Sequence, residues 1–85
     1  MHCDIFWLAA QPQGKALIEE YYRIAPAIVT AIRFSGDPDA AYPAIWKNWL
    51  RPCYDALCRK DNEACFALYT DMVHTLKARY LQEAA

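Results

Sequence analysis

The feature that most constrains the fold of this chain is a proline in the middle of a five-turn amphipathic pattern. Apolar side chains recur at spacings of four, three, four and four residues, the period of one face of an α-helix. They are Leu17, Tyr21, Ile24, Ile28 and Ile32. Pro26 lies inside this run, where it has no N–H to donate to the Tyr22 carbonyl and its ring crowds that carbonyl. We therefore predict a helix from near Lys15 to just before Ser35, with a kink or a break between Tyr22 and Ala25. The kink either wraps the helix round its neighbours or, as the alternative, opens a pocket.

A second helix is predicted to follow, and it too contains a proline. Asp37-Pro38-Asp39 supplies a capping residue and first-turn residues, and Pro43 is early enough in the helix to be tolerated. The apolar stripe of this helix consists of Tyr42, Ile45, Trp46, Trp49, Leu50, Cys53 and Leu57. Pro52 interrupts the pattern one turn before its end, so we expect a second bend near Asn48 to Arg51.

The last predicted helix, from about Asn62 to Leu81, contains no glycine or proline. Its buried face is marked by Cys65, Leu68, Tyr69, Met72, Val73, Leu76 and Tyr80. A short helix at residues 4–10, capped by Asp4, is expected before the first long one. Three helices of roughly 20 residues, each about 30 Å long, predict an all-α fold. We expect a single domain over residues 1–85, built as a small antiparallel bundle with the N-terminal segment across one end.

Composition excludes several classes of partner. The chain has 85 residues and a net charge of −1, so it has no long-range attraction for nucleic acid or anionic lipid. No window approaches the roughly 20 apolar residues of a membrane span, and the start lacks the pattern of a signal peptide. These features predict a cytoplasmic protein, in which the four cysteines remain reduced thiols.

The cysteines and histidines are candidate metal ligands, but their spacing is unfavourable. Cys53 and Cys58 are five residues apart, about 140° round a helix, and Cys65 and His74 are about 180° apart. His2-Cys3 at the N-terminus is at most a loose, adventitious site. The sequence therefore predicts no bound metal and no other cofactor.

One acid/base pair is present, Asp71 and His74, spaced three residues apart on the last helix. Catalysis would also need a nucleophile, an oxyanion site and a pocket, none of which the sequence indicates. With only Gly14 and Gly36, a glycine-rich phosphate loop is excluded. We predict a protein that is not an enzyme and has no catalytic residues.

Large aromatic residues indicate an interaction surface. Three Trp, six Tyr and three Phe are many for a chain whose core must be thin. Several of them flank the apolar stripes and widen the apolar surface beyond what one neighbouring helix covers. They are Tyr22, Tyr42, Trp46, Trp49 and Phe66. The alternative is a broad core, because each helix of a three-helix bundle needs a wide stripe.

Scattered positions follow an order that resembles a known family. The first group is Phe6, Leu8, Pro12, Gly14, Leu17, Tyr21-Tyr22 and Ala25-Pro26. The second is Ile45-Trp46, Leu50-Arg51-Pro52-Cys53 and Leu68-Tyr69-Thr70-Asp71-Met72-Val73 followed by Leu76. Together they resemble the helical tail of CFI-box-CTERM type proteins over most of residues 6–81, although the Cys-Phe-Ile box is absent from Met1-His2-Cys3-Asp4-Ile5. The resemblance implies a helical fold and no established activity, cofactor or partner.

The interpretation that follows is a non-enzymatic helical module for protein–protein interaction. We expect it to self-associate, with a dimer favoured, or to bind another protein, but not nucleic acid or a membrane. The alternative is a helical protein that binds a small ligand or a metal through the bent helices or the cysteines.

Overall fold

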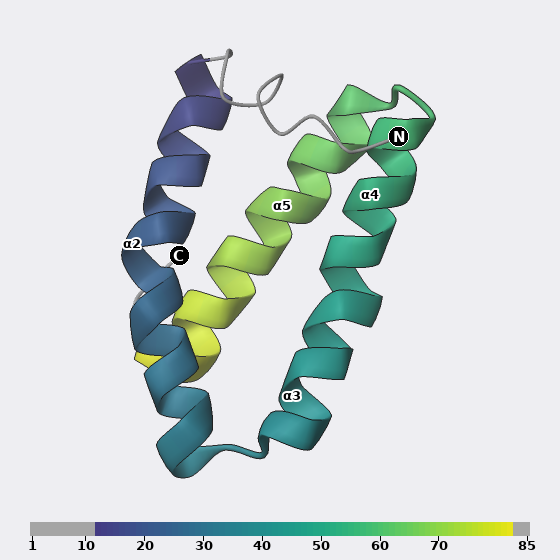
Figure 1. Cartoon of the computed structure of the whole chain (residues 1–85). Coiled ribbons are helices and arrows are strands. Elements are labelled where there is room, and N and C mark those ends of the chain that lie inside the picture. The colour runs from purple at the N-terminus through teal and green to yellow at the C-terminus, as the bar shows by residue number, and fades with distance from the viewer. Residues whose placement is uncertain (1–11, 83–85) are drawn as a thin grey trace.

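A computed structural model of the protein describes residues 12–82, apart from the side chain of Ser35. Within this range the chain forms three helical segments and no strand, which confirms the all-α prediction (Figure 1). The first segment is α2 (Pro12–Ser35). The second joins α3 (Pro38–Ile45), a π-helical turn η1 (Trp46–Leu50) and α4 (Arg51–Cys58), and the third joins α5 (Asn62–Leu76) to a second π-helical turn, η2 (Lys77–Leu81). The short helix predicted at residues 4–10 lies outside the described residues.

Helix α2 begins three residues earlier than its predicted start near Lys15. Pro12 occupies its first position, where a proline costs nothing because the N–H it lacks would have no partner within the helix. The helix continues through Pro26 and ends at Ser35. Gly36 closes the end by donating its N–H to the Ile32 carbonyl at 3.1 Å. A Cβ on Gly36 would lie 3.2 Å from backbone atoms of Ile32, so this close turn favours glycine. The kink at Pro26 stays a prediction.

The second segment starts where the sequence predicts. The Asp37 side chain accepts a hydrogen bond from the Asp39 N–H at 3.1 Å, and Pro38 is the first helical residue. Further along, the backbone widens into η1, in which the Arg51 N–H donates to the Trp46 carbonyl. This π-helical turn ends two residues before Pro52, which has no N–H of its own to donate. The interruption expected at Pro52 is therefore a widened turn, whereas a bend of the helix axis there stays a prediction.

The third segment begins at the polar turn between α4 and α5. Lys60 adopts a left-handed backbone conformation with φ of 59°, and the Asp61 side chain caps α5 by accepting from the Ala64 N–H at 3.2 Å. Helix α5 begins at Asn62, as predicted, and the segment extends to Leu81 through η2. The sequence does not indicate this second π-helical turn.

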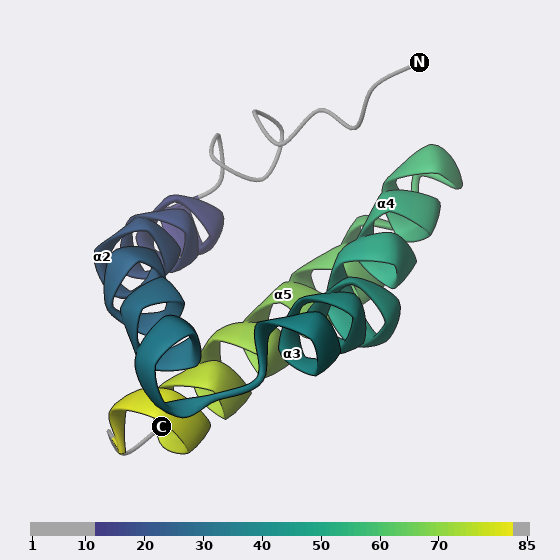
Figure 2. The same ribbon diagram turned by 60° about the horizontal axis from the view of Figure 1, so that its bottom comes forward.

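Helix α5 is the element that both other segments share. Helix α4 runs beside it in both views, whereas α2 packs against its C-terminal part and against η2 (Figures 1 and 2). The largest fully buried side chains come from α2 and α5, and they are Ile24, Ile32, Cys65, Met72 and Val73. The core therefore follows α5, and α2 approaches α3 closely only near their connecting turn (Figure 2).

Candidate interaction surface and interhelical pocket

Three of the five aromatic residues that the sequence indicates as a surface are exposed. Tyr22 exposes 66% of its surface, Trp46 51% and Tyr42 42%. Phe66 is half-buried and packs against the core. Trp49 is only 7% exposed, so the expectation that it lies on the surface is wrong. Its indole Nε1–H donates to the Asp71 carboxylate at 2.8 Å, which satisfies the one polar group of the ring.

Four exposed apolar side chains lie in two rows that we call the apolar rim: Tyr22 and Val29 on α2, and Tyr42 and Trp46 on the second segment. On α2, Val29 lies seven residues, or two turns, after Tyr22 and exposes 41% of its surface. On the second segment, Trp46 follows Tyr42 by four residues, about one turn. Val29 and Tyr42 line the same pocket, so the two rows lie on either side of it.

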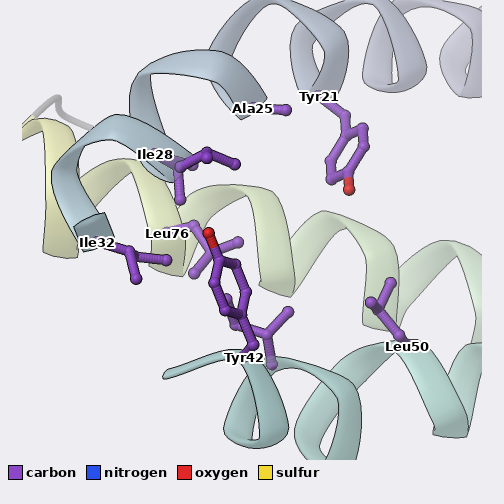
Figure 3. A pocket seen from close by; sticks show the side chains of 9 residues that line it. Tyr21, Ala25, Ile28, Ile32, Tyr42, Leu50 and Leu76 are labelled. Atoms are coloured by element: carbon purple, nitrogen blue, oxygen red, sulfur yellow. The ribbon is translucent and has the colours of Figure 1, made fainter. Parts of the chain in front are cut away.

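The hollow between these rows is the interhelical pocket. Its volume is about 250 Å³, and α5 supplies its floor. Nine side chains line it: Tyr21, Ala25, Ile28, Val29, Ile32, Tyr42, Ile45, Leu50 and Leu76. Figure 3 shows the walls from α2 and from the second segment facing each other across Leu76. The pocket runs along the part of α2 that contains Pro26. This is the position at which a pocket was the alternative to a kink with a purely structural role.

Two hydroxyl groups are the only side-chain polar groups of the lining. Tyr21 extends into the pocket from α2 and Tyr42 from α3, so their hydroxyls approach from opposite walls (Figure 3). Neither hydroxyl has a hydrogen-bond partner within residues 12–82. The Tyr21 ring is held by an edge contact with Tyr22, at 5.8 Å between ring centroids, and by a tilted contact with Tyr69 at 5.5 Å. The pocket is thus apolar with two fixed groups that can donate or accept a hydrogen bond.

The ion pairs of Glu20 lie away from this pocket. Glu20 pairs with Arg23, whose Nε donates to its carboxylate at 2.7 Å, and Lys77 Nζ lies 3.9 Å from the same carboxylate. Glu20 is nine residues from Val29, which places the two on opposite sides of α2. The pair between Glu20 and Lys77 therefore connects α2 to η2 on the side away from the apolar rim.

Within residues 12–82, two cysteines are held in the core and no cysteine belongs to a metal-binding arrangement. Cys53 is buried on α4 and donates its thiol to the Cys65 carbonyl at 3.6 Å, and Cys58 is half-buried. Among residues 12–82 no three Cys, His, Asp or Glu side chains come together as metal ligands. His2 and Cys3 lie outside the described residues. Burial raises the pKa of the Cys65 thiol and, more strongly, of the Tyr69 hydroxyl, because the charged forms lose hydration.

The acid/base pair of the sequence is also not assembled as a site. Asp71 uses its carboxylate to accept from Trp49, and no hydrogen bond joins it to His74. Both residues are exposed on α5. The observed role of Asp71 is to fix a core tryptophan.

Sequence reasoning missed most of the residues that line the pocket. Val29 was detectable, because it shares a helical face with Tyr22 outside the buried stripe. Ala25 and Leu50 were not, because an alanine and a stripe leucine look the same in a packed core and in an open wall. Tyr21 was assigned to the core stripe, and only the tertiary structure shows that its hydroxyl points into a hollow.

Comparisons of the chain with family models, with curated proteins and with solved structures find no match. The resemblance to the tail of CFI-box-CTERM type proteins therefore stays a prediction. Within the described part of the chain, no helix has the length and apolar character needed to cross a membrane.

Proposed function

We propose that this protein is a non-enzymatic helical interaction module that self-associates through the apolar rim, with a dimer as the favoured state. The observation that carries the proposal is the exposure of four large apolar side chains on two helices, of which Val29 and Tyr42 line one apolar pocket. Single exposed apolar residues are common, but several large ones beside an apolar hollow are typical of an interaction site. Tyrosine and tryptophan are also the residue types that contribute most to binding energy at interfaces.

The shape of the surface suits a helix of a second copy. The two rows of the rim stand on separate helices, so an apolar helix face laid across both rows would contact side chains of each. In the proposed arrangement each chain is an antiparallel bundle whose helices bend at Pro26 and Pro52, and the partner adds a further helix. A net charge of −1 gives little repulsion between copies. A different protein with an apolar helix would fit the same face.

The test is sedimentation of the purified chain at micromolar concentrations. The wild type is expected at twice the 9.8 kDa chain mass. Trp46→Ser should raise the dissociation constant about tenfold to a hundredfold, because truncating a hot-spot tryptophan costs about 1.5–3 kcal/mol. The control is Phe34→Ser: Phe34 is 82% exposed, but it lies five residues from Val29, on another side of α2.

Each result has a separate meaning. A wild type that sediments as a monomer throughout the range would remove self-association and leave a different protein as the partner. Association that is weakened by Phe34→Ser and unaffected by Trp46→Ser would place the interface at the α2–α3 turn, contrary to the proposal.

A further inference from the structure

We propose that the interhelical pocket is a binding site for a neutral, largely apolar small molecule of one or two rings that carries a hydrogen-bonding group. The inference goes beyond self-association and rests on a different observation. That observation is the pair of tyrosine hydroxyls, Tyr21 and Tyr42, which point into the pocket from opposite walls without partners within residues 12–82.

The volume of the pocket sets the size of the ligand. A cavity of about 150 Å³ lined by Leu, Ile and Phe side chains is large enough to bind benzene, and drug-sized ligands occupy roughly 300–1,000 Å³. The 250 Å³ of this pocket falls between these sizes. A bicyclic molecule is therefore a suitable occupant, and a larger one would extend into solvent past Val29 and Tyr42.

The lining sets the charge of the ligand. No charged side chain is among the nine that line the pocket. A charged group placed there would lose hydration with no ionic partner in return, which weakens its binding. The ion pairs of Glu20 lie on the far side of α2 and do not compensate such a charge. A neutral molecule is favoured.

The two hydroxyls set the position of its polar group. Each phenol can donate or accept, so a hydroxyl, carbonyl or N–H group of the ligand finds a partner on either wall. Tyr21 is held in place by its contact with the buried Tyr69 ring, which reduces the entropy lost when a ligand binds. Ile28, Ile32 and Leu76 are buried and supply fixed apolar walls. Val29 and Tyr42 are partly exposed and form the entrance.

The experiment uses two matched probes, naphthalene and 2-naphthol, which share two rings and differ in one neutral hydroxyl. Titration of each into the full chain, followed by calorimetry or by shifts of amide resonances, is expected to show saturable binding of one molecule per chain. The shifted resonances should come from α2, α3 and the centre of α5. Absence of saturable binding of both probes would overturn the proposal.

Two alanines on α2 provide a matched pair of variants. Ala25 lines the pocket and faces its interior, whereas Ala27 is exposed and lies 160° away from it round the helix, by about 100° a residue. Ala25→Leu fills the pocket and should weaken both probes at least tenfold, and Ala27→Leu should leave them unchanged. Equal effects of the two substitutions would contradict binding in the pocket.

The hydroxyls are tested without changing the shape of the pocket. The double substitution Tyr21→Phe and Tyr42→Phe should weaken 2-naphthol about threefold to tenfold, the usual net effect of one hydrogen bond, and leave naphthalene unchanged. Tyr22→Phe is the control, because Tyr22 does not line the pocket. If the double substitution changes the affinities of both probes equally, the hydroxyls do not have the assigned role. This result can be obtained even if Ala25→Leu fails to fold.

Sedimentation of the same variants separates this proposal from self-association. The phenylalanine variants keep every ring of the apolar rim, so association should persist while discrimination between the probes is lost. Probe binding that disappears as the chain associates would overturn the proposal and assign the pocket to a second copy.

Discussion

At the scale of single residues, Trp46 and Trp49 show how neighbouring tryptophans of one stripe take opposite roles. Both belong to η1, yet Trp46 is half exposed and Trp49 is buried. The difference is set by α5, because Trp49 reaches the Asp71 carboxylate there and can bury its ring with the indole N–H satisfied. Helical periodicity places both residues in the stripe and does not distinguish them.

The bond between Trp49 and Asp71 makes a prediction about stability. Asp71→Ala removes the acceptor and leaves a part-buried N–H without its partner, so the free energy of unfolding should fall by about 1–2 kcal/mol. Urea denaturation measures the change. His74→Ala is the control, since His74 is exposed on the same helix and should change stability by less than about 0.5 kcal/mol. If Asp71→Ala lowers the free energy of unfolding no more than the control does, water replaces the carboxylate as the acceptor of the Trp49 N–H.

At the scale of elements, α2 contains a costly residue at an exposed position. Pro26 cannot donate to the Tyr22 carbonyl, and its own carbonyl accepts a second bond, from the Thr30 hydroxyl at 3.0 Å. The side chain of Pro26 is exposed, so packing does not require its ring. The helix is therefore stabilised here by burial of its apolar stripe, Ile24, Ile28 and Ile32, and not by the intrinsic helix propensity of its residues.

Pro26→Ala tests whether the proline shapes the fold. If α2 can pack equally well when straight, the substitution restores one backbone bond and should raise the free energy of unfolding by about 1–3 kcal/mol. Pro12→Ala is the matched control, because a proline at the first helical position has little cost and its removal should change stability little. A loss of stability in Pro26→Ala would mean that the core needs a bend at this position. Thermal and urea unfolding, with amide resonances of α2, distinguish the two outcomes.

Local signals explain which elements were predictable from the sequence. The caps at Asp37 and Asp61 and the proline at position 38 act within one turn, and the second and third helices start where these signals place them. The π-helical turns were not predictable as such: Pro52 indicates an interruption beside η1 but not its form, and no proline lies near η2. The pocket was not predictable either, because it depends on how separate helices are placed relative to one another. Its walls are 10 or more residues apart in the chain, and only their relative placement makes a hollow.

At the scale of the whole molecule, the structure depends on one helix, α5, whose buried side chains form the core together with both neighbouring segments. Helix α5 meets α4 on one side and α2 on another, and its central residues Cys65, Tyr69, Met72 and Val73 are all buried. A chain of 85 residues buries a modest share of its surface, so the loss of packing on this helix is expected to unfold the protein as a unit. Two of these central residues carry ionisable groups whose neutral form the core requires.

Alkaline pH should therefore destabilise the entire fold. In the unfolded chain Cys65 and Tyr69 lose their protons near their usual pKa values of 9.0 and 10.0, whereas burial raises both pKa values in the folded state. A raised folded pKa contributes stability that is complete below the unfolded pKa and is lost as pH rises towards the folded one. The free energy of unfolding should thus fall from about pH 9 upward, and above pH 10 Tyr69 alone contributes up to about 1.4 kcal/mol per pH unit.

Tyr69→Phe should reduce this slope in urea titrations between pH 7 and about pH 11, and Tyr22→Phe, at an exposed tyrosine, should leave it unchanged. Equal slopes in wild type and Tyr69→Phe would show that the hydroxyl ionises in the folded core, so that the buried contact between Tyr21 and Tyr69 is open to water.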